Sequence, residues 1–126
     1  MNIEQLESVI ARNAILDPND NIGQEECWNQ MTAILSSNIE ETLRYFQGEC
    51  TDEAFYWLSA VFEDVAEKTQ SREFIKVLRD RLSGISQECY CQDHFSSEHM
   101  KTLVDYTEYV RSISVDIDSA ESRLRD

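Results

Sequence analysis

Two cysteines and two histidines lie close together and are the side chains best suited to carry chemistry. Cys89, Cys91, His94 and His99 follow the pattern C-x-C-x2-H-x4-H, and four such ligands could surround a tetrahedral zinc ion. One residue between the cysteines is a tighter spacing than the roughly two to four residues usual in zinc sites. If residues 86–94 are helical, the two cysteines also point to different sides. Two buried thiols and two surface histidines explain the pattern equally well, and we expect neither a metal nor a cofactor.

Other constellations that could catalyse a reaction are weak in this chain. Cys91 and His94 could touch across one helical turn, but the residues around them match no nucleophile motif. Paired acids such as Glu40-Glu41 arise by chance in a chain with 25 Asp and Glu residues. No glycine-rich phosphate loop and no EF-hand loop occurs in the sequence. The sequence therefore predicts a protein that is not an enzyme.

Aromatic and acidic side chains share one helical segment and predict a partner-binding surface. The residues are Tyr56, Trp57, Glu63, Asp64 and Glu67, which lie largely off the apolar face of that segment. Interface hot spots favour Tyr and Trp, and acids beside them would attract a basic partner. In the alternative interpretation, Trp57 closes the edge of the core and the acids form a solvated face.

A second surface of the same kind is expected on the last helix. Asp105, Glu108, Tyr109 and Asp116 fall on its outer face, away from an apolar line that includes Val110, Ile113 and Ile117. This interpretation puts Tyr109 among acids on the outer side of the helix, as a second candidate for contact with a partner.

Apolar residues recur at helical spacing along the whole chain. The expected helices cover about residues 3–14, 24–36, 38–48, 52–68, 71–84, 86–94 and 96–124. The residues suited to cap helix starts are Ser37 or Asn38, Thr51 or Asp52, and Ser71. Gly48 and Gly84 are suited to helix ends. The second helix is expected to place Trp28 on its apolar side with Cys27 and Met31.

These elements predict an all-α fold. The 126 residues are enough for one domain, and only 3 Gly and 1 Pro are available for turns, which favours long helices. We expect a single domain over residues 1–126, with five to seven helices in an antiparallel bundle or a HEAT-like stack and a long C-terminal helix. No clean repeat period supports the stack.

The chain is strongly acidic, with a formal net charge of −14. Such a charge repels nucleic acid and anionic membranes and attracts basic partners, although solubility alone is the simpler explanation. No apolar run is long enough to span a membrane. The N-terminus carries acids rather than the basic and apolar regions of a signal peptide, so we expect a cytoplasmic protein with reduced cysteines.

The stretch EAFYWLSAVFEDVAEKTQSREFIKVLRDRL resembles a segment of small acidic bacterial immunity proteins, which accompany polymorphic or contact-dependent growth-inhibition toxins. The most recognisable residues are 57–62, Glu63-Asp64 and 68–71, and the whole stretch covers about a quarter of the chain. The resemblance implies a protein that binds a cognate toxin domain in the cytoplasm and blocks its active site or an exosite. A toxin of the nuclease type would be basic, because its substrate is a polyanion.

Three hypotheses remain open from the sequence. The first is a toxin-neutralising immunity protein, acting as a monomer or weak homodimer and contacting neither nucleic acid nor membrane. The second is an acidic interaction adaptor or nucleic-acid mimic with no toxin partner. The third is an enzyme or metal protein built on Cys89, Cys91, His94 and His99.

Overall fold

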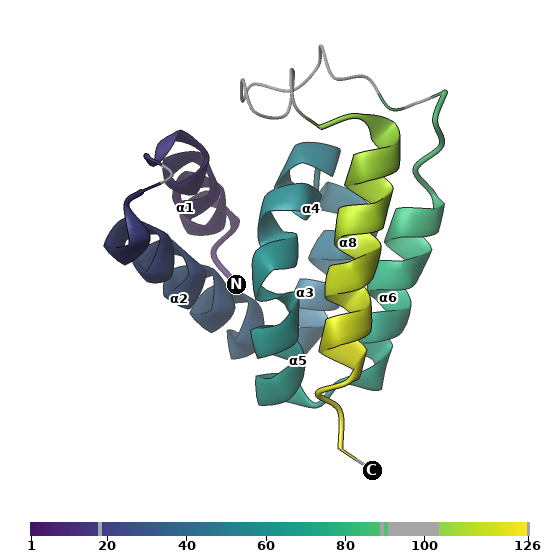
Figure 1. Cartoon of the computed structure of the whole chain (residues 1–126). Coiled ribbons are helices and arrows are strands. Elements are labelled where there is room, and N and C mark those ends of the chain that lie inside the picture. The colour runs from purple at the N-terminus through teal and green to yellow at the C-terminus, as the bar shows by residue number, and fades with distance from the viewer. Residues whose placement is uncertain (18, 89, 91–103, 126) are drawn as a thin grey trace.

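The computed structural model describes residues 1–17, 19–88, 90 and 104–125, and within these ranges it contains helices and no strands (Figure 1). In chain order the elements are α1 (Ile3–Ile15), α2 (Asn21–Ser37), α3 (Ile39–Arg44), the π-helix η1 (Tyr45–Glu49), α4 (Asp52–Leu58), the 3₁₀ turn η2 (Ser59–Val61), α5 (Phe62–Thr69), α6 (Arg72–Ser83) and α8 (Tyr106–Glu121). The predicted all-α fold is confirmed. None of these helices combines the length and the apolar character needed to cross a membrane.

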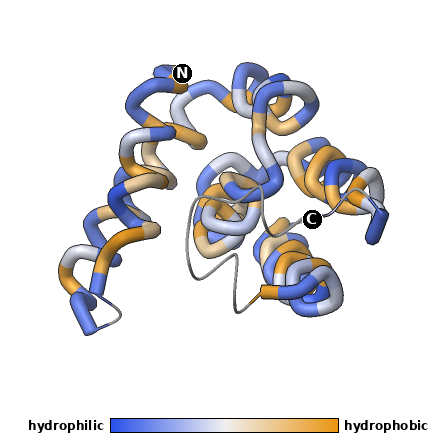
Figure 2. Tube along the Cα trace, turned by 90° about the horizontal axis from the view of Figure 1, so that it is seen from above, coloured by the Kyte–Doolittle hydropathy of each residue, from blue (hydrophilic) through white to orange (hydrophobic). Residues whose placement is uncertain are grey.

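The helices form a layered arrangement in which α1 and α2 make a hairpin that leans against the rest (Figure 1). α8 packs on α5 and α6, α2 packs on α5, and α1 packs on α4. α4, α5 and α8 run in the same direction, and α6 runs antiparallel to them. Figure 2 shows apolar residues on the sides of the helices that face one another. One cluster of buried residues joins all of these elements.

Polar caps begin most of the helices, as their spacing predicts. Asn38, Thr51 and Ser71 each accept a hydrogen bond from the backbone N–H three residues further on, which confirms their predicted capping roles. Gly84 ends α6 as expected. Gly48 does not end a helix, because it lies inside η1 with a negative φ. The helix that precedes it therefore closes as a π-helix rather than in a left-handed glycine cap.

The long helix predicted over residues 52–68 is interrupted. The 3₁₀ turn η2 separates α4 from α5, and the hydroxyl of Ser59 donates to the Tyr56 carbonyl oxygen at 2.5 Å. That bond gives the backbone an alternative to the regular helical ladder. A 3₁₀ turn advances about 120° per residue rather than about 100°, so it rotates α5 relative to α4.

The C-terminal helix is shorter than predicted. α8 begins at Tyr106, and Asp105 caps it by accepting a hydrogen bond from the Glu108 N–H at 2.8 Å. The expected helix over residues 96–124 is therefore wrong at both ends, since Val104 and Asp105 are not helical and α8 stops at Glu121. Residues 86–88, expected to begin a helix, form a turn, and most of the remainder of that segment lies outside the described residues.

Four phenylalanines form the centre of the core. Phe46 contacts Phe55, Phe62 and Phe74 with ring centroids 5.8–6.0 Å apart in edge-to-face geometry, and all four side chains are fully buried. Edge-to-face pairs of this kind add about 0.5–1.5 kcal/mol each beyond the area that they bury. Trp28, expected on the buried side of α2, is instead 38% exposed, because among the described residues α2 packs on its neighbours through the side that carries Cys27 and Met31.

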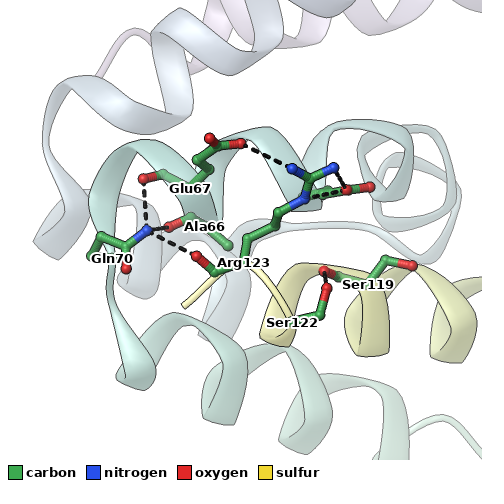
Figure 3. A network of polar contacts seen from close by, with 7 residues as sticks. Ala66, Glu67, Gln70, Ser119, Ser122 and Arg123 are labelled. Atoms are coloured by element: carbon green, nitrogen blue, oxygen red, sulfur yellow. Dashed lines mark hydrogen bonds and ion pairs between the residues drawn. The ribbon is translucent and has the colours of Figure 1, made fainter. Parts of the chain in front are cut away.

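Gln70 ties the C-terminal residues to the end of α5 (Figure 3). It ends the helix in the left-handed conformation, with a φ of 51°. Its amide nitrogen donates to the carbonyl oxygens of Glu67 at 2.9 Å and Arg123 at 3.1 Å. Its amide oxygen accepts from the Arg125 N–H at 2.7 Å. These bonds position the Arg123 guanidinium against α5.

Replacement of Phe46 by Ala should destabilise the fold strongly, because the cavity would open between three other rings. We expect a loss of about 3–5 kcal/mol in the free energy of unfolding, measured by urea titration of helical circular dichroism. Ile22→Ala is the matched control, since Ile22 is 75% exposed. It should change stability by no more than about 0.5 kcal/mol. Equal effects of the two substitutions would contradict the placement of Phe46 at the centre of the core.

Candidate functional site

The two aromatic residues predicted on α4 lie on different flanks of the helix. The Tyr56 ring faces α8 and stacks on Tyr109 with centroids 5.9 Å apart. The Trp57 side chain lines a groove beside α1, with Ile10 and Ala14. The rings of Tyr56 and Trp57 still touch, with centroids 5.5 Å apart. Both side chains are half-buried, so the structure supports neither a fully exposed nor a fully buried Trp57.

The prediction that Tyr109 lies on an outer face is wrong. Tyr109 is fully buried, and its hydroxyl donates to the backbone carbonyl of Asp52 at 2.6 Å. Its ring also contacts Tyr90, with centroids 5.0 Å apart. Burial is the main cause that raises the pKa of this phenol. α8 packs between α5 and α6, so its buried face runs through Tyr109, Ile113 and Ile117, rotated from the predicted line.

Four of the predicted residues come together along the junction of α4–α5 with α8. We call Tyr56, Glu63, Glu108 and Asp116 the acidic surface. Burial is the main cause that raises the pKa of Tyr56, and the charges of Glu108 and Asp116 raise it further. The charge of Glu63 raises the pKa of Asp116. Tyr56 therefore lies within electrostatic reach of Glu108 and Asp116, and Asp116 lies within reach of Glu63. Glu108 is exposed, and the other three are half-buried.

Asp116 is the most unusual member of the acidic surface. Burial raises the pKa of this carboxyl above its ordinary value, and the negative charge of Glu63 raises it further, while a hydrogen bond with Ser59 opposes both effects. A half-buried carboxylate beside a second acid opposes folding rather than supporting it. Groups held in unfavourable surroundings of this kind cluster at functional sites.

Arg123 occupies part of the predicted acidic face. Its guanidinium forms an ion pair with Glu63 and lies 3.6 Å from the Glu67 carboxylate (Figure 3). Asp64 is turned away toward α2, in a depression of about 430 Å³ that also includes Glu67 and Lys68. Glu67 and Asp64 are therefore partly balanced by neighbouring cations. Asp105 is engaged as the cap of α8, which gives it a structural role.

The Trp57 groove is a feature that the sequence did not reveal. It has a volume of about 480 Å³ between α1, η1 and α4. We define the Trp57 groove by Glu7, Ile10, Ile15, Glu49, Glu53 and Trp57, which all line it. No local pattern in the sequence could predict this groove, because α1 and α4 are brought together only by tertiary packing.

The two cysteines that the structure describes are unsuited to nucleophilic catalysis. Cys27 and Cys50 are buried free thiols. Burial raises the pKa of Cys50 to about 12, so its thiol stays protonated at neutral pH. Burial also raises the pKa of Cys27. Neither thiol is therefore available as a thiolate.

The predicted metal cluster cannot be placed. Cys89, Cys91, His94 and His99 lie outside the described residues. Elsewhere in the part of the chain that the structure describes, no three His, Cys, Asp or Glu side chains gather to hold a metal ion. Comparisons with protein-family models, with curated proteins and with solved structures found no match to this chain.

Replacement of Tyr109 by Phe tests whether this residue is structural. Loss of the hydroxyl leaves the Asp52 carbonyl without its donor, and we expect stability to fall by about 1 kcal/mol, measured by urea titration. Thr107→Ala, an exposed change on the same helix, should leave the midpoint unchanged. An unchanged midpoint for Tyr109→Phe would contradict the buried hydrogen bond.

Replacement of Asp116 by Asn should stabilise the protein at about pH 7 and have no such effect near pH 3. The raised pKa means that the folded state binds this proton more tightly, so stability declines as pH rises through the folded-state value. Asn cannot acquire the charge, and its advantage disappears where Asp116 is protonated in both states. Thermal melts across this range measure the difference. An NMR titration that puts Asp116 at or below the usual value of about 4 would contradict the prediction.

Proposed function

We propose that this protein is an immunity protein that binds a basic bacterial toxin domain and neutralises it. The observation that carries the proposal is the acidic surface, where Tyr56, Glu63, Glu108 and Asp116 converge from segments about fifty residues apart. The unfavourable surroundings of Asp116 are its sharpest feature, because a partner cation would relieve them. The resemblance of residues 53–82 to immunity proteins supports the same conclusion.

The proposed mechanism is occlusion of a cationic site. A toxin that acts on nucleic acid presents Lys and Arg side chains to bind phosphates. The net charge of −14 would accelerate encounter with such a surface, by an amount that declines as salt rises. Tyr56, held against Tyr109 at 5.9 Å, offers a preorganised aromatic edge within the acids. Once bound, the inhibitor would exclude the substrate sterically and electrostatically.

Arg123 would regulate how much negative charge the partner meets. Its ion pair with Glu63 lies at the edge of the acidic surface and is exposed, so it contributes little to folding. A partner cation could replace Arg123 at Glu63 at small energetic cost. Glu108 makes no ion pair within the described residues and is open to a partner from the start.

Co-expression with the product of the adjacent upstream gene in a sensitive bacterium tests the proposal. We expect the natural chain to rescue growth and the double variant Glu108→Lys/Asp116→Asn to lose rescue, with affinity reduced on the order of tenfold or more. The control Glu25→Lys/Glu88→Gln makes the same change in net charge at exposed residues outside the acidic surface. Circular dichroism establishes that both variants fold.

The outcomes separate the function from the site. Rescue by the natural chain that both double variants retain would keep the function and reject the acidic surface. Equal loss of rescue in both would show that only total charge matters. A neighbour without toxicity, and no rescue, would reject the immunity function and leave an acidic adaptor or nucleic-acid mimic as the better explanation.

A further inference from the structure

The Trp57 groove lies on a different flank of α4 from the acidic surface and has its own chemistry. Its floor is apolar, with Ile10, Ala14, Ala54 and Trp57 among the lining residues. Its volume of about 480 Å³ falls within the range of roughly 300–1,000 Å³ found for ligand pockets. The groove is therefore large enough to receive several apolar side chains.

The apolar floor continues onto the surface of the protein. Ile15, at the last position of α1, is 85% exposed although it lines the groove. A single exposed apolar residue needs no explanation, but one that extends an apolar groove enlarges a continuous patch. Trp57, half-buried at the other side, offers the type of side chain that most often anchors an interface.

Acids line the rim of the groove, and none of the described lining residues is Lys or Arg. Glu7 comes from α1, Glu49 from η1 and Glu53 from α4, so the negative charge surrounds the floor from three elements. Burial is the main cause that raises the pKa of Tyr45, which also lines the groove, and the charges of Cys50, Glu7 and Glu49 raise it further. In the described part of the chain, neither Glu7 nor Glu49 forms an ion pair.

Charge selects among the possible occupants. A second copy of this chain carries a net charge of −14 and would be repelled by the rim. Nucleic acid and anionic lipid would be repelled for the same reason. A segment with apolar side chains on one face and Lys or Arg on its flanks satisfies both the floor and the rim. The walls of the groove are two helices, α1 and α4, and helix-in-groove binding uses this geometry.

We propose that the Trp57 groove binds a basic amphipathic helix of a partner protein, with its apolar face on Ile15 and Trp57 and its cations at Glu7, Glu49 and Glu53. The groove is separate from the acidic surface and binds such a helix whether or not the partner is a toxin. A partner side chain at the centre of the helix contacts the indole, while flanking cations reach the three carboxylates.

A synthetic helix of Leu and Lys provides the probe, with Leu at positions i, i+3, i+4 and i+7 and a scrambled peptide of the same composition as its control. The protein carries Trp28→Phe, so that Trp57 is the only tryptophan of the chain. At low salt we expect the helix to shift the Trp57 emission to the blue and to bind at least about tenfold more tightly than the scrambled peptide. Absence of the shift, or equal binding of both peptides, overturns the proposal.

Matched charge reversals locate the bound helix. In the Trp28→Phe background, Glu7→Lys/Glu49→Lys should weaken binding by about tenfold or more, relative to Glu25→Lys/Glu88→Lys, which changes the net charge equally at exposed residues outside the groove. Ile15→Ser should weaken binding several-fold without loss of fold, because its side chain is exposed. Glu108→Lys should bind as the background protein does. Equal weakening by the two double variants, or an unaffected Ile15→Ser, overturns the proposal.

Discussion

The contacts of Asp52 hold the parts of this structure in place. Its carboxylate accepts from the Arg81 guanidinium at 2.6 Å, while its backbone carbonyl accepts from the Tyr109 hydroxyl at 2.6 Å. Arg81 also donates to the Cys50 carbonyl at 2.9 Å and lies over the Phe55 ring. The start of α4 is thereby joined to η1, α6 and α8. Because α4 supplies Tyr56 to the acidic surface and Trp57 to the Trp57 groove, the placement of these two side chains depends on how the start of α4 is held.

The large net negative charge opposes folding, and several of the few Arg side chains form ion pairs between neighbouring helices. Arg79 pairs with Asp118 and Glu121 between α6 and α8, and Arg12 pairs with Glu26 between α1 and α2. Exposed pairs of this kind contribute less than about 1 kcal/mol each, so the aromatic core must supply most of the stability. Glu7, Glu49 and Glu108 form no ion pair among the described residues. That uneven distribution of ion pairs would suit the basic partner proposed above, since folding alone would favour neutralisation of these acids.

Local signals in the sequence were sufficient for most of the fold, and tertiary packing determined the rest. The caps Asn38, Thr51 and Ser71 were predictable because each bonds only to the next turn of the chain. The break at η2 was not, because Ser59 sits in an unbroken apolar periodicity and its hydroxyl bond appears only in the structure. The burial of Tyr109 was likewise not predictable from local sequence signals. A position on the predicted outer face became buried when α8 packed between α5 and α6.

The candidate site was predictable in composition but not in arrangement. The sequence identified Tyr56 and Trp57 together, and adjacent residues on a helix differ by about 100° in direction. That angle is enough to send Tyr56 toward α8 and Trp57 toward α1, so one predicted surface became two. The two surfaces also have different physical characters. In the proposed binding, the acidic surface would attract a partner at long range and govern the rate of association, whereas the apolar groove would act only on contact and govern dissociation. A partner that covered α4 from both sides would combine rapid encounter with slow release, and neither surface alone provides both.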